Sequence, residues 1–409
     1  MKPMGPIPDG YAADNDGHLL VGGRRVADWV DVAGDTPLFL YDRAMLDARV
    51  AMLRVAMPEK LAIHFAIKAN PFTPVLAHMA GLVDGFDVAS GREMQFALAA
   101  GLDAGHVSFA GPGKRDRELG AAIAAGVTIN LESAGEAARA LAIADAAGVV
   151  PRLAVRVNPD FDLKGSGMRM GGGAKPFGVD ADRVPTLVGD LISAGADWRG
   201  FHIFAGSQAL DAAAIADTQA QTVALAARLA DEIGATPPLV NLGGGLGVPY
   251  FPNDRAVDIA HVGDALASVL VARGDALAGS RFAIELGRWL VAEAGIYVTR
   301  IVDRKVSHGE TFLVVDGGLH HQLAASGNFG TVVRRNYPLA LANRFGAPVE
   351  ETVSVVGCLC TPLDRLGDQI GLPRGDVGDL AVLFMAGAYG ASASPAQFLG
   401  QGPAIEMMV

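Results

Sequence analysis

Between about residues 37 and 290 the chain repeats one pattern, in which a short apolar run is followed by a longer, Ala-rich amphipathic segment. The eight runs are LAIHFAIK (61–68), GFDVAS (85–90), VSFAG (107–111), TINLES (128–133), RLAVRV (152–157), GFHIFAG (200–206), LVNLGGG (239–245) and RFAIEL (281–286). Strands that alternate with helices predict βαβ units and a parallel sheet. Eight such units predict a (β/α)8 TIM barrel, and a doubly wound open sheet is the alternative.

The pattern changes after residue 290, where strand-like runs follow one another with few helices between them. The segment 295–318 predicts a β-hairpin that turns at His308-Gly309, and HLLVGGRRV (18–26) predicts another at Gly22-Gly23. We therefore expect an N-terminal segment (1–36) that joins the β domain, a barrel (37–290) and an antiparallel β domain (291–409).

Composition narrows the function classes. Of the 409 residues, 51% are hydrophobic and 19% are charged, which allows a large core and argues against disorder. The net charge of −11 repels phosphate backbones and anionic lipid, so we expect no nucleic-acid and no membrane partner. No apolar run reaches the roughly 18 residues of a membrane span, and the first 20 residues lack the apolar core of a signal peptide. With only two cysteines a disulfide framework is excluded, and we expect a soluble, cytoplasmic protein.

Polar residues stand at the ends of five of the apolar runs, where a barrel carries its catalytic groups. They are Lys68, Asp87, Arg156, His202 and Glu285. A lysine that leaves an apolar strand is partly desolvated, which lowers the pKa of its amine and suits it to a Schiff base. The alternative is a lysine that extends its amine into solvent.

Two of these residues allow several interpretations. Glu285 needs a cationic partner if it is buried, which is either Arg288 or a protonated ring nitrogen of a ligand. His202 is a metal ligand, a general acid or a hydrogen-bonded core histidine. We expect no metal, because the sequence has no HExxH or paired CxxC motif and His320-His321 would point to opposite faces of a strand.

Two further features carry possible chemistry. Gly243-Gly244-Gly245 would bring backbone N–H groups close to an anion, or would simply make a tight turn. The glycines at 111 and 113 before Lys114 do not match a phosphate-binding P-loop, and we expect an ordinary loop. Cys358 and Cys360, two apart in a strand-like run, would face the same side, with Cys360 the better placed to be exposed and reactive.

Taken together, these motifs resemble the fold-type III, pyridoxal-phosphate-dependent decarboxylases of the ornithine, diaminopimelate and arginine decarboxylase family. The resemblance covers nearly the whole chain. The matching segments, in family order, are FAIKAN (65–70), FDVAS (86–90), HIFAGSQ (202–208), GGG (243–245), ELGR (285–288), VVDGG (314–318), GCLCTPLDRL (357–366) and MAGAYG (385–390).

The resemblance implies a barrel that binds pyridoxal 5'-phosphate, a β domain, and a homodimer with shared active sites. Lys68 would hold the cofactor through a Schiff base, Glu285 would pair with the pyridine nitrogen, and His202 would stack on the ring. Cys360 of the partner subunit would protonate the substrate carbon. The implied cofactor-binding residues are Lys68, Asp87, Arg156, His202, Ser207, Gly244, Gly245, Glu285, Arg288 and Tyr389.

Departures from the family pattern bear on the substrate. The family often has Asp or Glu after the cysteine, where this chain has Thr361, and diaminopimelate enzymes usually have Arg-Pro where this chain has Ala324-Ala325. Loss of a charge-assisted bond costs roughly 1.5–3 kcal/mol, so diaminopimelate, ornithine and lysine should bind poorly. The substrate-binding candidates are Arg288, Arg334, Arg335, Tyr337 and Asp364.

The remaining segments, including DGGLHHQLAASGNFGTVVRRNYP (316–338), are similar to butirosin-type decarboxylases that act on a carrier-bound glutamyl group, and to exosortase-associated decarboxylases. The expected substrate is therefore a free amino acid or an aminoacyl group on an acyl carrier protein. Arg334 and Arg335 would meet a carboxylate or a phosphopantetheine, or form a solvated basic pair. The alternatives are a diaminopimelate decarboxylase, a racemase on the same barrel, and a non-catalytic regulatory homologue.

Overall fold

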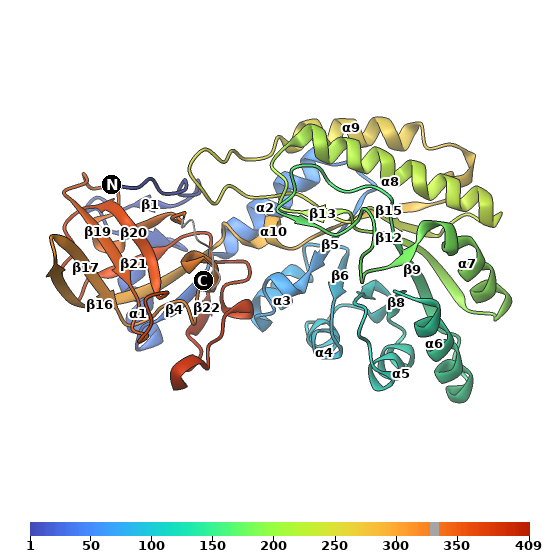
Figure 1. Cartoon of the computed structure of the whole chain (residues 1–409), viewed down its shortest axis with the longest axis horizontal. Helices are drawn as coiled ribbons and strands as arrows, with labels where there is room; N and C mark the ends of the chain where they lie inside the picture. The colour runs from blue at the N-terminus through green and yellow to red at the C-terminus, as the bar shows by residue number, and fades with distance from the viewer. Residues whose placement is uncertain (328–334) are drawn as a thin grey trace. The chain divides into compact units, whose positions relative to one another are not determined.

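The computed structural model describes residues 1–327 and 335–409 and divides into two compact units, coloured along the chain in Figure 1. The barrel unit comprises Val50–Gly247 and Ala256–Gly287. The β unit comprises Met1–Arg49, Val248–Arg255 and Arg288–Val409. The β unit is thus assembled from three separate stretches of sequence.

Within the described residues, eight parallel strands close into the predicted barrel. They are β5 (Ala62–Ala66), β6 (Gly85–Val88), β7 (Val107–Phe109), β8 (Thr128–Leu131), β9 (Arg152–Asn158), β12 (Asp197–Ile203), β14 (Leu239–Asn241) and β15 (Arg281–Leu286). Each strand pairs with the next in the sequence, and β15 pairs with β5, so the sheet has no open edge. This closure confirms the TIM barrel and excludes the open sheet. Short additions are β10 (Met168–Arg169), β11 (Val179–Asp180) and β13 (Gly206–Ser207).

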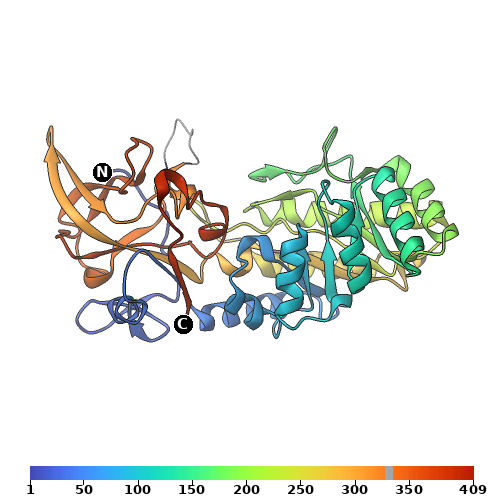
Figure 2. The ribbon, with the colours of Figure 1, turned by 90° about the horizontal axis from the view of Figure 1, so that it is seen from below.

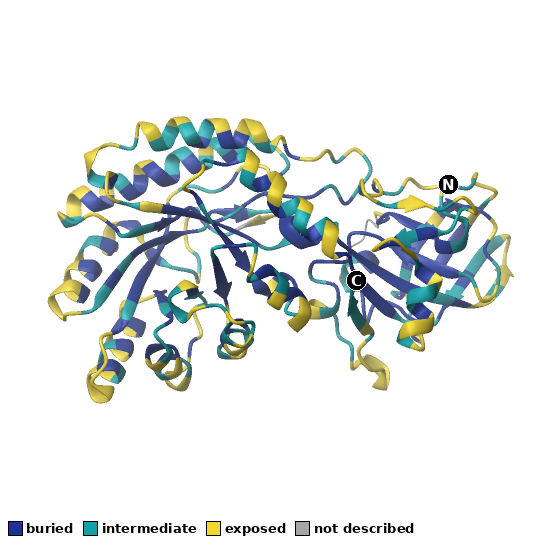
Figure 3. Cartoon of the chain, turned by 180° about the vertical axis from the view of Figure 1, so that it is seen from behind, coloured by how far each residue is buried: buried dark blue, intermediate teal, exposed yellow. Residues whose placement is uncertain are grey.

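Helices surround the barrel sheet, with buried residues on their inner faces and exposed residues outside (Figure 3). They are α2 (Arg43–Ala56), α3 (Thr73–Met79), α4 (Gly91–Ala99), α5 (Asp116–Ala125), α6 (Ala134–Ala147), α7 (Val184–Ser193), α8 (Ala212–Ile233) and α9 (Ile259–Val271). Ser133 caps the start of α6 by accepting the N–H of Glu136, and Gly148 ends that helix in the left-handed conformation. Local sequence signals therefore set both ends of α6.

The barrel strands are buried almost throughout, as the dark strands in Figure 3 show. Phe65, Phe86, Phe109 and Phe201 are at most 2% exposed. Helices cover one face of each strand and the barrel interior the other, which explains why the strands appear in the sequence as nearly continuous apolar runs. Polar residues interrupt these runs mainly near the strand ends, where the candidate site lies.

The β unit is built mainly from antiparallel strands (Figures 1 and 2). Its strands are β1 (Ala12–Ala13), β2 (Leu19–Val21), β3 (Arg24–Arg25), β4 (Leu38–Tyr41), β16 (Gly295–Ser307), β17 (Glu310–Val315), β18 (Leu339–Leu341), β19 (Glu351–Val356), β20 (Arg365–Leu372), β21 (Leu380–Leu383) and β22 (Ile405–Met408). Its helices are α1 (Val26–Ala33) and α10 (Arg288–Val291).

Both hairpins predicted from the sequence are confirmed. Ser307 pairs with Glu310 across the His308-Gly309 turn, and Val21 pairs with Arg24 across Gly22-Gly23. In the part of the chain that the structure describes, no helix is both long and apolar enough to span a membrane.

Candidate active site

Four of the predicted polar residues lie in or directly after strands of the barrel unit. Lys68 follows β5 in a single helical turn (Ile67–Ala69), Asp87 lies in β6, His202 in β12 and Glu285 in β15. Asp87, His202 and Glu285 are buried, whereas the Lys68 side chain is 46% exposed. The amine of Lys68 is therefore the member of this group that a ligand can reach most easily.

The Glu285 carboxylate contacts both Lys68 and His202. The Nε2 of His202 donates to Oε2 of Glu285 at 2.9 Å, and Nζ of Lys68 lies 3.9 Å from Oε1. Burial alone would raise the pKa of the Glu285 carboxyl, but the hydrogen bond from His202 and the charge of Lys68 lower it to about 2. The carboxylate therefore stays ionised at neutral pH and can hold a proton on a basic nitrogen nearby.

Asp87 is a buried carboxylate that makes no hydrogen bond in the described structure. Its Oδ2 lies 3.3 Å from Nδ1 of His64 on β5, an ion-pair contact that is not aligned as a hydrogen bond. Burial lowers the pKa of His64, but Asp87 outweighs it and raises that pKa overall. The Nδ1 of His202 is also buried without a partner among the described residues. Orphaned polar atoms of this kind indicate a site built to receive a polar ligand.

Arg156 is held in place by Glu132, which follows β8. The Nη1 of Arg156 donates to Oε1 of Glu132 at 2.9 Å, and both side chains are at least nine-tenths buried. Glu132 also accepts the N–H of Gly111 at 2.6 Å and that of Gly178 at 2.7 Å. Burial raises the pKa of Glu132, but Arg156 and the other contacts lower it overall. The pair thus fixes Arg156 on β9.

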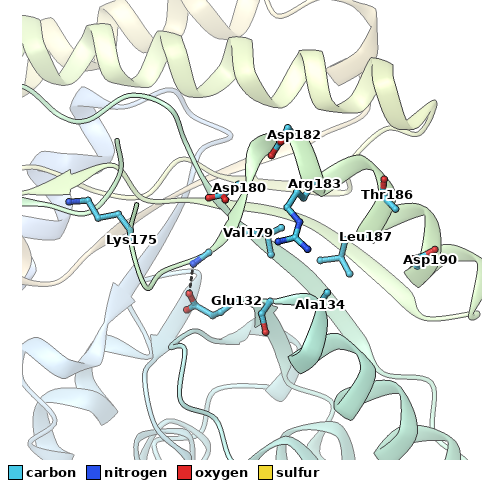
Figure 4. Close-up of a pocket in the computed structure, with 12 residues that line it drawn as sticks. Glu132, Ala134, Lys175, Val179, Asp180, Asp182, Arg183, Thr186, Leu187 and Asp190 are labelled. Atoms are coloured by element: carbon cyan, nitrogen blue, oxygen red, sulfur yellow. Dashed lines mark hydrogen bonds between the residues drawn. The ribbon is translucent and has the colours of Figure 1, made fainter. Parts of the chain in front are cut away.

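A cavity of about 390 Å³ lies beside Glu132 (Figure 4). Its lining combines the acidic Asp180, Asp182 and Asp190 with the basic Lys175 and Arg183. A lining of mixed charge selects no particular class of ligand, and we assign none to it.

The glycine run after β14 contains backbone N–H groups that have no hydrogen-bond acceptor among the described residues. The N–H of Gly243 donates to Oδ1 of Asn241 at 2.9 Å, whereas the described residues offer no acceptor to the N–H groups of Gly244 and Gly245. A Cβ on Gly244 would collide with the carbonyl oxygen of Glu285, and Gly245 has a φ of +119°. The chain needs glycine at both positions, and two unused amides there fit an anion.

Ser207 lies in the segment that pairs with this glycine turn. The N–H of Ala209, two residues beyond Ser207, donates to the carbonyl oxygen of Gly245 at 2.9 Å, and the N–H of Gly247 donates back to Ala209 at 2.8 Å. The structure therefore brings Ser207 and the predicted glycines into adjoining loops of the barrel unit.

In the β unit, Arg288 is surrounded by tyrosines. Its Nη1 donates to the Tyr250 hydroxyl at 2.8 Å, and its guanidinium carbon lies 4.6 Å from the ring centroid of Tyr389. Its Nε is buried and has no partner among the described residues. Burial lowers the pKa of Arg288, but its contacts with Tyr250 and Tyr389 raise it overall. Tyr389 has a φ of +58°, an uncommon conformation for a residue with a side chain.

Tyr337 continues this aromatic cluster. Its ring stacks on that of Tyr250 with the centroids 4.8 Å apart, and it meets the edge of Phe251 at 5.6 Å. The guanidinium carbon of Arg335 lies 3.8 Å from the Phe251 centroid. Burial raises the pKa of both tyrosines, so their hydroxyls remain protonated. Arg334, the other predicted basic residue, lies outside the described residues.

Cys358 and Cys360 lie in a loop, and the expectation that they share one side of a strand is wrong. β19 ends at Val356 because Gly357 turns the chain, and the N–H of Gly357 donates to the carbonyl oxygen of Asp364 at 2.9 Å. Both thiols are free and exposed. Thr361 stays in the same turn, where its N–H donates to Leu359 at 2.8 Å.

The expectation for His320 and His321 is also wrong. Both lie in a turn after β17 rather than in a strand, and their ring centroids are 3.8 Å apart instead of on opposite faces.

Three residues of these clusters were missed by sequence reasoning: His64, Glu132 and Tyr250. Glu132 lies near the end of the predicted run 128–133, and a polar residue at the end of such a run is the same signal that identified Lys68 and Glu285. His64 lies inside a strand, and only the barrel geometry shows that it meets Asp87. Tyr250 lies in the segment Val248–Arg255, which belongs to the β unit although it falls between barrel elements in the sequence.

The chain is similar to a protein family and to known proteins that are named as decarboxylases. Residues 43–292 match the family model for the pyridoxal-binding domain of pyridoxal-dependent decarboxylases. The chain is 35% identical to the L-glutamyl-[BtrI acyl-carrier protein] decarboxylase of Niallia circulans, over 91% of this chain and 89% of that protein. It is 29% identical to the 2-[(L-alanin-3-ylcarbamoyl)methyl]-2-hydroxybutanedioate decarboxylase of Staphylococcus aureus, over 88% and 91%.

The fold is likewise that of a solved structure. Diaminopimelate decarboxylase of M. jannaschii in complex with L-lysine superposes with a TM-score of 0.88 at 23% identity, over 98% of this chain and 93% of that one.

Proposed function

The chain belongs to the pyridoxal-dependent decarboxylase family, and from this premise we propose that it removes CO2 from an acidic amino acid or from an aminoacyl group tethered to a carrier protein. It is a carboxy-lyase with pyridoxal 5'-phosphate as its cofactor. The observation that carries the proposal is the trio of Lys68, His202 and Glu285 at the strand ends of the barrel.

The residues of the barrel unit fit this cofactor. When bound, pyridoxal phosphate supplies an electron-poor ring that takes up the electron pair released when CO2 leaves. The exposed amine of Lys68 is the group that would attach the cofactor. The ionised Glu285 would keep a proton on the ring nitrogen, since its pKa lies far below neutrality. The hydrogen bond from His202 fixes the orientation of that carboxylate.

The phosphate would occupy the glycine turn. The N–H groups of Gly244 and Gly245, which have no acceptor among the described residues, would form a neutral donor set for an anion together with the hydroxyl of Ser207 in the adjoining loop. Arg288, whose buried Nε has no partner among the described residues, is the predicted cofactor-binding arginine of the β unit. Asp87 and Arg156 would line the cofactor site.

The proton that replaces CO2 would come from Cys360 of the partner subunit. Cys360 is exposed in its loop, as a group that serves a neighbouring chain must be. We therefore propose a homodimer whose active sites are shared between the subunits.

The proposed substrate class rests on two charged side chains that the family often has and this chain lacks, and on one arginine that this chain has. Thr361 offers no charge to a distal ammonium group and Ala324 offers none to a distal carboxylate, so diaminopimelate and ornithine lose their anchors. Arg335, held over Phe251, would instead meet an anion, either a side-chain carboxylate or a phosphopantetheine. The glutamyl-carrier activity of the Niallia circulans relative supports this choice.

Steady-state kinetics test the proposal. The value of kcat/KM is measured with free glutamate, glutamate on an acyl carrier protein, meso-diaminopimelate and L-ornithine. We expect one of the two glutamate forms to give the highest value. A regulatory homologue would turn over none of them.

A further inference from the structure

His320 is a fully buried histidine whose ring makes no hydrogen bond. It is 0% exposed, and neither Nδ1 nor Nε2 has a partner among the described residues. The adjacent His321 is different, because its Nδ1 contacts the Tyr297 hydroxyl at 2.9 Å and its Nε2 donates to the carbonyl oxygen of Gly402 at 2.8 Å. A buried polar group left unpaired is destabilising by about 1–3 kcal/mol. A ligand bound to a ring nitrogen of His320 would remove this cost.

Two metal-binding side chains stand next to His320. A ring nitrogen of His320, the Sγ of Cys358 and a carboxylate oxygen of Asp364 all lie within 4.8 Å of one another. The three residues come from separate places in the β unit: the turn after β17, the loop after β19, and the residue before β20. The fold thus brings together an imidazole, a thiol and a carboxylate.

The Asp364 carboxylate is held in position by backbone on two sides. Its Oδ1 accepts the N–H of Leu319 at 2.7 Å, and its Oδ2 accepts the N–H of Leu359 at 2.9 Å. A Cβ on Gly318 or Gly357 would collide with this carboxylate, so both glycines make room for it. Asp364 is 2% exposed, and no cationic side chain pairs with it in the described part of the chain. A buried carboxylate without a cation needs a positive charge nearby.

From this arrangement we propose a divalent metal site, most suited to Zn²⁺, formed by His320, Cys358 and Asp364. One neutral imidazole, one thiolate and one carboxylate balance the charge of the ion, and this mixture of nitrogen, sulfur and oxygen donors is typical of zinc. Three protein ligands leave a fourth position for water or another ligand.

The three ligand atoms would have to move slightly closer together to bind a metal ion. Bonds of about 2.0–2.3 Å in a tetrahedral site place ligand atoms roughly 3.3–3.8 Å apart, compared with up to 4.8 Å in the structure. Cys358 is the exposed member of the three, and its side chain would have to move inward. Metal binding would then tie the loop that carries Cys360 to the turn after β17. We expected no metal from the sequence, in part because His320 and His321 were considered as a pair of ligands. The site proposed here uses His320 with the thiol of Cys358 instead.

The test uses the holoenzyme, freed of metal with a chelator and then titrated with Zn²⁺ by calorimetry. Co²⁺ serves as a second probe, because thiolate-bound Co²⁺ absorbs at longer wavelengths than the cofactor does. We expect one Zn²⁺ per chain and a visible Co²⁺ band. Cys358→Ser should bind Zn²⁺ at least tenfold more weakly and lose the band, whereas Cys360→Ser, altered in the same loop, should keep both.

Unfolding of a variant must be separated from loss of the site. Zn²⁺ should raise the Tm of the wild type and of Cys360→Ser but not that of Cys358→Ser, and circular dichroism should show that all three are folded. If Cys358→Ser is unfolded, His320→Gln takes its place in each measurement. Equal Zn²⁺ affinity in the wild type and the ligand variant, or no Co²⁺ band in the wild type, would overturn the proposal.

Discussion

The Nε2 of His202 donates to Oε2 of Glu285 at 2.9 Å, which joins β12 and β15 at the centre of the candidate site. The two strands are not neighbours in the sheet, because β14 lies between them. The bond therefore links the two strands that pair with opposite edges of β14. It gives Glu285 a fixed orientation and helps to keep it ionised.

Replacing Glu285 by Gln should lower kcat by about 10- to 100-fold, the range expected when a charge-assisted hydrogen bond is lost. It should also change the pH dependence of stability. The pKa of Glu285 is about 2 in the folded protein and roughly 4.3 in an unfolded chain. The native state thus binds fewer protons, and the contribution of Glu285 is complete above pH about 4.3 and lost as the pH falls toward 2.

Urea unfolding at pH 5 and pH 3 measures this effect. The wild type should lose more stability over this interval than Glu285→Gln does, since the variant has no carboxylate to protonate. Equal losses in the two proteins would contradict the ionised, hydrogen-bonded state of Glu285.

Lys68 should carry the cofactor. Borohydride reduction should fix the cofactor covalently to the protein, and peptide mapping should find the label on Lys68. Lys68→Ala should give no labelled peptide, whereas Lys60→Ala, which changes another exposed lysine of the barrel unit, should label normally. A label on a different lysine in the wild type would refute the assignment.

Gly244→Ala should weaken cofactor binding, because the new Cβ would collide with the carbonyl oxygen of Glu285 and displace the open amides. Gly113→Ala is a matched control, since a Cβ there meets no atom within 4 Å. Cofactor affinity is measured by fluorescence titration of the apoenzyme. Similar affinities in the two variants would show that the glycine turn does not hold the phosphate.

Much of the fold follows from local sequence signals. The eight apolar runs became the eight barrel strands, and Gly22-Gly23 and His308-Gly309 turn the hairpins as predicted. Lys68, His202 and Glu285 were found because parallel strands end at the same edge of a barrel.

Contacts between distant segments could not be predicted in this way. The loop that holds Cys358 and Cys360 has strand-like composition, but backbone bonds to Asp364 and the turn at Gly357 end the strand early. The pairing of Tyr250 with Arg288 joins a segment inserted between barrel elements to α10. Nothing in the local pattern of either segment indicates the other.

Activity should return when two inactive chains are mixed, if the active sites are shared. Lys68→Ala and Cys360→Ala chains that pair at random form mixed dimers half the time, each with one intact site, which gives about a quarter of wild-type activity. Subunit exchange is verified separately with differently tagged chains. If exchange occurs and no activity returns, Cys360 does not act across the interface.

Thr361→Asp should restore an anchor for a distal amine. The kcat/KM for L-ornithine, relative to that for the preferred substrate, should rise by about tenfold or more, in line with a charge-assisted bond of roughly 1.5–3 kcal/mol. Thr361→Asn has nearly the same shape without the charge and should give little gain. Equal gains in the two variants would show that charge at position 361 does not select the substrate.

The most direct test of the proposed substrate class is kcat/KM of the wild type for glutamate, free and carrier-bound, against meso-diaminopimelate, because specificity is the ratio of these values. We predict that one glutamate form is preferred and that diaminopimelate is a poor substrate. Turnover of diaminopimelate near 10⁴ M⁻¹s⁻¹ or above, the scale of ordinary enzymes, would contradict the account and show that other residues replace the missing anchors.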